Sequence, residues 1–159
     1  MKLRTEHSPD VVIDAVISAS RVLVAVAARS LSDIADEVTL AQYRTLVVLA
    51  SRGPQNLAGL AEAIGVTPAT ATRMCDRLAK KKLILRRAER NDRRQVRLAR
   101  SARGASLVDA VTSRRRVEIE RILRAVAPND RAVLVQALHQ FAVAAGEVPE
   151  QDWSTGWDL

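Results

Sequence analysis

Thirteen basic side chains lie between Arg73 and Arg103 with only three acidic residues among them, so this segment carries a net charge of +10. The rest of the chain carries −3, which makes the total +7. Lysine and arginine neutralise phosphates and release their counterions, so a basic segment on a slightly acidic body favours binding of a polyanion. A solvated face that only confers solubility is the competing interpretation.

The beginning of this segment, with the residues just before it, has the spacing of a helix that could read DNA. One face is apolar, and we expect it to be buried: Ala71, Met74, Cys75 and Leu78. The opposite face presents the candidate DNA-binding residues: Pro68, Ala69, Thr70, Thr72, Arg73 and Arg77. Arg73 is the candidate for a bidentate contact to guanine, which can discriminate between bases by about 1–3 kcal/mol. The two threonines could donate to phosphate or touch a thymine methyl group, and ordinary helix solvation explains them equally well.

A β-hairpin with a basic tip follows this helix. Two extended segments, the second strictly alternating, are separated by a polar stretch: Leu83–Ala88 and Gln95–Arg100. The tip carries four more candidate DNA-binding residues: Arg90, Asp92, Arg93 and Arg94. We expect Arg94 to enter the minor groove and the other two arginines to contact phosphates. Asp92 is placed to accept hydrogen bonds from the loop backbone and to hold Arg94, because a carboxylate beside phosphates is unfavourable. A merely solvated tip is the alternative.

Other residue types offer little chemistry. Cys75 is the single cysteine, which excludes an intramolecular disulfide. With His7 and His139 it leaves too few ligands for a zinc cluster, so we expect neither a metal nor a cofactor. Its place on the apolar face predicts core packing instead of redox sensing, because a buried thiol ionises poorly. The sequence contains no phosphate-cradling glycine loop and no His-Glu metal motif, so an enzyme is not expected.

Length and composition indicate one ordinary soluble domain. The chain has 159 residues, of which 48% are hydrophobic and 27% charged, so it can bury a core. Aromatic residues make up only 3%, which favours helices over sheets. The longest uninterrupted apolar run, Val22–Ala28, is far shorter than the roughly 20 residues that cross a bilayer. Charged residues interrupt any signal peptide, so we expect a cytoplasmic protein with no membrane partner.

Capping signals place the helices around the basic segment. A capping box at Thr39-Leu40-Ala41-Gln42 predicts a helix from Leu40 to about Ser51, with Tyr43 placed for a hydrophobic staple. Asn56 caps a helix over Leu57–Ile64, and Gly65 ends it. Thr67-Pro68 then opens the helix that runs to about Lys81. A helix-turn-helix followed by a hairpin predicts a winged helix over residues 39–100, although short helical hairpins also occur in proteins that bind no DNA.

The flanking regions 8–37 and 101–145 are expected to be helical. Ser8-Pro9-Asp10 begins one long helix, Ser101 begins another that runs to about Val126, and Pro128 begins the last. Their apolar stripes are too long for one small domain to cover, which predicts a helical homodimer interface. The segment 146–159 is expected to be an irregular acidic tail, with Trp153 and Trp157 able to dock back. The fold class is therefore mainly α with a small β-hairpin wing, in a single unit of residues 1–159: a winged helix-turn-helix flanked by N- and C-terminal dimerisation helices.

Over about residues 10–145 this order of elements resembles the MarR family (multiple antibiotic resistance regulators) of bacterial transcription factors. The most specific match is Arg86-Arg87-Ala88-Glu89-Arg90-Asn91-Asp92-Arg93-Arg94-Gln95, which is similar to the family's wing and contains its Asp-x-Arg signature. Residues 40–44, 60–61 and 76–78 are also similar. Lys82 departs from the family, which usually has glycine there, and a non-glycine residue implies a strained or altered turn.

The resemblance implies a homodimer whose terminal helices interlock and whose two winged helices bind a pseudo-palindromic operator in double-stranded DNA. It also implies a small, often phenolic effector, or an oxidant, that weakens DNA binding, and on that basis we expect a repressor. Arg21, Tyr43 and Arg44 are candidates for an effector pocket between the dimer lobe and the DNA lobe, although the staple explains Tyr43 equally well. The alternative function is a winged-helix interaction module that binds an acidic partner instead of specific DNA.

Overall fold

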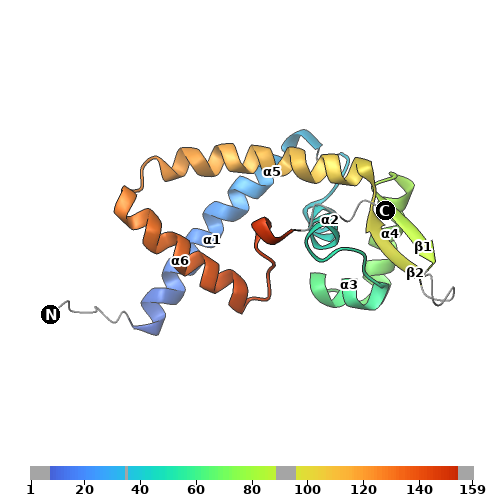
Figure 1. The fold of residues 1–159 in the computed structure, drawn as a ribbon, viewed down its shortest axis with the longest axis horizontal. Helices are drawn as coiled ribbons and strands as arrows, with labels where there is room; N and C mark the ends of the chain where they lie inside the picture. Colours follow the sequence, from blue (N-terminus) through green and yellow to red (C-terminus); the bar gives the residue numbers. More distant parts are fainter. Residues whose placement is uncertain (1–7, 35, 89–95, 154–159) are drawn as a thin grey trace.

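The computed structural model describes residues 8–34, 36–88 and 96–153, which form an elongated, mainly helical molecule (Figure 1). Its elements are α1 (Pro9–Leu31), η1 (Ser32–Ile34), α2 (Leu40–Arg52), α3 (Leu57–Ile64), α4 (Pro68–Lys80), β1 (Ile84–Ala88), β2 (Val96–Arg100), α5 (Ala102–Leu123), α6 (Pro128–Ala144) and η2 (Glu150–Asp152). Figure 1 shows α5 running along one edge, with the winged unit at its start and the α1 and α6 helices toward its end. The predicted mainly α fold with a small β-hairpin wing is confirmed.

Local capping explains where α2, α3 and α4 begin. The Thr39 hydroxyl accepts from the Gln42 backbone N–H at 3.2 Å, and the Gln42 side chain accepts from the Thr39 N–H at 3.1 Å. Asn56 and Thr67 cap the next two helices through their side-chain oxygens. Gly65 ends α3 in the left-handed region, with φ 71° and ψ 38°. These capping predictions are confirmed, whereas Ser8 occupies the N-cap of α1 without a side-chain capping bond.

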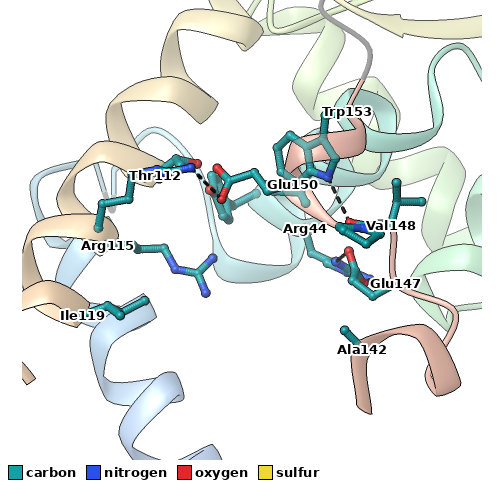
Figure 2. Close-up of a pocket in the computed structure, with 13 residues that line it drawn as sticks. Arg44, Thr112, Arg115, Ile119, Ala142, Glu147, Val148, Glu150 and Trp153 are labelled. Carbon is teal, nitrogen blue, oxygen red and sulfur yellow. Dashed lines mark hydrogen bonds and ion pairs between the residues drawn. The ribbon is translucent and has the colours of Figure 1, made fainter. Parts of the chain in front are cut away.

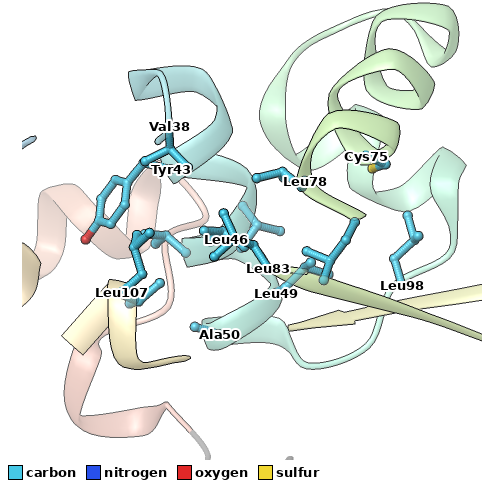
Figure 3. Packing of buried hydrophobic residues seen from close by; sticks show 14 of the residues in the cluster. Val38, Tyr43, Leu46, Leu49, Ala50, Cys75, Leu78, Leu83, Leu98 and Leu107 are labelled. Carbon is cyan, nitrogen blue, oxygen red and sulfur yellow. The ribbon is translucent and has the colours of Figure 1, made fainter. Parts of the chain in front are cut away.

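The hydrophobic core lies inside the winged unit, between α2, α3, α4, the start of β1 and the start of α5 (Figure 3). Its largest fully buried side chains include five leucines: Leu46, Leu49, Leu60, Leu78 and Leu83. Burial of each such side chain contributes about 1.5–3 kcal/mol. The recognition helix and the wing are therefore fixed to the same core, which makes them one rigid unit.

The wing is an antiparallel pair in which Ile84 lies opposite Arg100 and Ala88 lies opposite Val96. A backbone bridge joins it to the turn after α2: Leu98 N donates to Gln55 O at 2.7 Å, and Gln55 N donates to Leu98 O at 3.0 Å. Antiparallel pairs in isolation are marginally stable, so this third backbone partner helps to hold the hairpin. The predicted tip lies outside the described residues.

The turn between α4 and β1 contains Lys82 in the left-handed region, at φ 59°. It is the only non-glycine residue with positive φ in the described part of the chain. The Ser101 hydroxyl donates to the Lys82 carbonyl at 2.7 Å, which fastens the strained residue to the start of α5. The strained turn predicted from the departure at this position is confirmed.

Replacing Lys82 with glycine is expected to raise the free energy of unfolding by about 0.5–1 kcal/mol. Left-handed backbone costs an L-residue about 1–2 kcal/mol, while glycine loses about 0.5–1 kcal/mol through backbone entropy, so the difference favours the variant. Urea unfolding followed by circular dichroism measures it. Lys82→Ala is the matched control, because it removes the same side chain and keeps the strain. Equal stability of the two variants would show that backbone strain is not what the glycine relieves.

The flanking helices expose long apolar surfaces. No residue of α6 is buried, and on α1 only Val26, Ser30 and Leu31 are buried. An 18-residue window within Pro9–Ile34 has a mean hydropathy of 2.1, so this helix is long and apolar enough to cross a membrane by composition. The sequence prediction of no membrane span counted only uninterrupted apolar residues, and such a count does not detect an apolar average of this kind over a whole helix. A face that packs against a second protein has the same composition.

Candidate nucleic-acid interface

Helix α4 presents one buried and one accessible face, as its spacing predicts. Its four apolar residues are buried: Ala71, Met74, Cys75 and Leu78. On the other face Pro68, Ala69, Arg73 and Arg77 are exposed, while Thr70 and Thr72 are half-buried. The structure therefore brings all six predicted residues of this helix onto one accessible surface next to the wing.

Hydrogen bonds at the start of α4 set what this surface can offer to DNA. The Arg73 guanidinium donates to the Thr70 hydroxyl oxygen at 3.3 Å, which orients its fork along the helix. The Thr67 hydroxyl also donates to that oxygen, at 3.0 Å. The Thr72 hydroxyl donates to the Pro68 carbonyl at 2.8 Å, so its proton is engaged within the helix. A phosphate contact donated by Thr72 would have to break this bond, whereas the guanidinium is available without rearrangement of the backbone.

The body of the wing adds basic residues that were absent from the predicted contact set. Arg86 forms an ion pair with Asp76 of α4, which links the wing to the recognition helix. Arg87 and Arg97 lie directly opposite each other across the strands, and both are exposed. Their alternation on the two strands was the available sequence signal. The Arg97 guanidinium donates to the Pro54 carbonyl at 3.2 Å, which ties the second strand to the turn after α2. The tip residues Arg90, Asp92, Arg93 and Arg94 lie outside the described residues and stay predictions.

Cys75 is buried in the core on the inward face of α4 (Figure 3). Desolvation raises the pKa of its thiol; by smaller amounts, the nearby charge of Arg86 lowers this pKa and that of Asp76 raises it. A raised pKa leaves little thiolate at neutral pH, and burial blocks access to it. This placement agrees with core packing, the role that we expected from the sequence.

A disulfide reagent such as Ellman's reagent is expected to label native Cys75 more slowly than the urea-unfolded chain, by on the order of 100-fold or more. The physical reasons are the low thiolate fraction and the need for local opening of α4. Absorbance at pH 7 measures the rate, and unfolded protein of the same chain gives the reference. Labelling of the folded protein at the unfolded rate would contradict a buried, structural role.

A pocket of about 380 Å³ lies between α2, α5 and the segment that follows α6 (Figure 2). Tyr43 and Arg44 line it, as predicted for the effector pocket. Arg21 does not: it is exposed on α1 and donates to the Ser18 hydroxyl at 3.1 Å. Tyr43 is 4% exposed and also packs in the core with Val38, so the staple and the pocket share this residue. Residues after α6 complete the wall: Glu147, Val148, Pro149, Glu150 and Trp153. Sequence reasoning expected Trp153 to dock back, and its ring packs against the core, but the other four had no predicted role.

Comparisons with known proteins agree with this geometry. The model of the MarR family matches residues 38–96, which contain α2 to the start of β2. The crystal structure of RV1404 from Mycobacterium tuberculosis is 44% identical, covers 92% of this chain and 99% of its own, and superposes with a TM-score of 0.82. The chain belongs to the MarR family. Members of this family are transcription regulators and not enzymes.

Two more distant MarR-like structures share the fold. A MarR family protein from Bacillus stearothermophilus is 17% identical, with a TM-score of 0.79 over 92% of this chain and 99% of its own. BpsR from Bordetella bronchiseptica, whose DNA binding is regulated by 6-hydroxynicotinic acid, is 23% identical, with a TM-score of 0.62 over 82% of this chain and 98% of its own. No protein among those with curated functions matches the sequence.

Proposed function

We propose that this MarR-family regulator is a cytoplasmic homodimer that represses transcription by binding a pseudo-palindromic operator, and that a small aromatic anion releases it. In this proposal residues 39–100 bind double-stranded DNA, and regions 8–37 and 101–145 form the dimer. The wing tip contributes the predicted contacts of Arg90, Arg93 and Arg94, with Asp92 as the residue that holds Arg94.

The exposed basic face of α4 is the observation that carries the DNA-binding part. Arg73 and Arg77 point away from a core that fixes the helix, and the wing lies beside them with Arg87 and Arg97 exposed. A helix that is rigidly held can present a guanidinium fork to base edges, while flanking arginines contact phosphates and set the register. An acidic protein partner would not require such fixed spacing.

The uncovered apolar surface supports the homodimer. Exposed aliphatic and aromatic side chains on α1 and α6 are far more numerous than a soluble monomer usually leaves in contact with water. On α1 they are Val11, Val12, Ile13, Val16, Ile17, Val22, Leu23 and Val24, and on α6 Val133, Val135, Leu138, Phe141 and Val143. A second copy of the chain is the partner that offers the same surfaces in return.

The pocket between the lobes supports the effector. With residues 147–153 in place its volume is about 380 Å³, which is in the range of small-molecule sites, and Tyr43 lines its α2 wall. Arginine side chains from α2 and α5 face the same space, which suits a carboxylate. An aromatic acid of the kind that regulates BpsR has this size and charge.

Selection of duplexes from a randomised library by the full chain tests the proposal. The expected product is an inverted repeat whose half-sites have centres about 10 bp apart, because a two-fold dimer places two recognition helices one helical turn apart. Fluorescence anisotropy should then give a steep fall in affinity with salt, and tighter binding to the repeat than to a scrambled duplex. Binding with a salt slope and no sequence preference would contradict specific regulation.

A further inference from the structure

The chain turns back after α6 and inserts its next segment between the two lobes. Gly146 makes the turn at φ 71°, and the Arg52 guanidinium donates to its carbonyl at 2.8 Å. The indole N–H of Trp153 donates to the Val148 carbonyl at 3.1 Å (Figure 2). The ring packs against the hydrophobic core. We call Glu147–Trp153 the tail segment.

Two carboxylates of the tail segment form ion pairs with arginines that line the pocket. Glu147 accepts two hydrogen bonds from the Arg44 guanidinium of α2, at 3.0 and 2.5 Å. Glu150 pairs with Arg116 of α5 at 3.1 Å. The hydrogen bonds from Arg44 to Glu147 raise the pKa of this arginine. One glutamate is thus bound to the DNA lobe and the other to α5, so the tail segment bridges the two walls of the pocket.

A third arginine of the pocket is not occupied by the tail segment. Arg115 lines the cavity with its guanidinium directed into the open space (Figure 2). Within the described part of the chain it makes no hydrogen bond or ion pair. Two of the three cations that face this space therefore already hold a carboxylate supplied by the chain itself.

We propose that the tail segment is a built-in competitor for Arg44 and Arg116 of the effector pocket, and that an aromatic carboxylate displaces its glutamates when it binds these two arginines. This inference rests on the proposed effector function of the pocket. The ion pairs are accessible to solvent, with side-chain exposures of 40% and 35% for Arg44 and Glu147, and such pairs are weak enough to exchange. Only molecules whose tail segment is released can bind the carboxylate at these arginines. The apparent affinity of the pocket is therefore its intrinsic affinity multiplied by the fraction of such molecules. Displacement also breaks the bridge between α2 and α5, which couples ligand binding to the position of the DNA lobe.

Sodium benzoate is the probe, because it carries one carboxylate on an aromatic ring and no other polar group. The full chain with Trp157→Phe and 5-fluorotryptophan at Trp153 reports release of the tail segment by ¹⁹F NMR, with sodium chloride of equal ionic strength as the reference. Calorimetry on the same samples gives the benzoate affinity. The variants are Glu147→Gln with Glu150→Gln, and Asp152→Asn as the matched control, since Asp152 is exposed on the same segment and contacts none of these arginines.

We expect benzoate to shift the Trp153 signal of the wild-type chain. The double variant should show the shifted signal without benzoate and should bind benzoate roughly fivefold more tightly, while Asp152→Asn should behave as wild type. Binding of benzoate with an unchanged Trp153 signal, or equal affinity in the double variant, would contradict competition by the tail segment. Either result would still be consistent with an effector site in this pocket. Absence of binding in every variant would overturn the pocket as well, while the operator selection tests the DNA-binding function separately.

Discussion

Replacing Gly104 with alanine is expected to lower the free energy of unfolding by about 3 kcal/mol or more. Gly104 lies in the first turn of α5, where a Cβ would be placed 2.2 Å from the Leu83 carbonyl oxygen and 3.5 Å from Leu46 Cδ2. The Leu83 carbonyl cannot shift away without cost, because it accepts a hydrogen bond from the Ser101 N–H at 3.0 Å. Urea unfolding monitored by circular dichroism measures the loss.

Gly59→Ala is the matched control for this substitution. Gly59 also lies in the first turn of a helix, but there the added Cβ would meet only side-chain oxygens: Asn56 Oδ1 at 3.2 Å, which must shift by a few tenths of an ångström while it caps the helix, and Gln55 Oε1 at 3.5 Å, an ordinary contact. Its better helix propensity offsets that adjustment by up to about 1 kcal/mol, so a change close to zero is expected. Comparable losses at Gly59 and Gly104 would show that glycine replacement in a helix, and not the contact with Leu83, is responsible.

The sequence predicted the helices of the winged unit because their ends depend on neighbouring residues. The capping box at Thr39, the Asn56 cap and the left-handed Gly65 are each satisfied within a few positions along the chain. The strained turn at Lys82 was also found, through comparison with the family pattern. Local hydrogen bonds and backbone sterics are visible in a sequence whenever donor, acceptor and turn residue are close in number.

Contacts between distant segments were not predictable in this way. Gly104 looked like an ordinary helix residue until the structure placed it against Leu83, and the Arg86–Asp76 pair joins elements whose relative position depends on the whole core. The pairing of Arg44 with Glu147 spans more than half of the chain. Acidic and basic residues offer many possible partners, so composition showed only that the tail was acidic and that residues 73–103 were strongly basic.

The apolar face of α1 shows why the same pattern supported two different interpretations. Counting an uninterrupted run excluded a membrane span, whereas the average over Pro9–Ile34 passes the length and hydropathy test. Both observations are consistent with one physical fact, an exposed apolar face that needs a partner. Membership of the MarR family favours a second protein copy over lipid, because the members are soluble DNA-binding proteins.

Replacing Arg73 with alanine is expected to weaken binding to the selected operator by about 1–3 kcal/mol, or roughly 5-fold to 150-fold for each half-site. The guanidinium is exposed on α4, and its hydrogen bond to Thr70 holds it toward the helix start. Its loss therefore removes a hydrogen-bond donor of fixed orientation as well as a positive charge. Exposed residues of this kind contribute little to folding, so unfolding by urea should be nearly unchanged. Anisotropy titrations on the operator and on a scrambled duplex at one salt concentration measure the effect.

Arg73→Lys separates base reading from simple charge. Lysine keeps the positive charge and the phosphate attraction, but it lacks the planar fork that makes two parallel hydrogen bonds to guanine. The lysine variant should therefore keep the salt slope and the affinity for scrambled DNA while it loses most of the preference for the operator. The alanine variant should in addition lose about one unit of salt slope for each half-site if the same side chain also neutralises a phosphate. Full operator preference in the lysine variant would assign Arg73 to the phosphate backbone and leave base reading to other residues of α4.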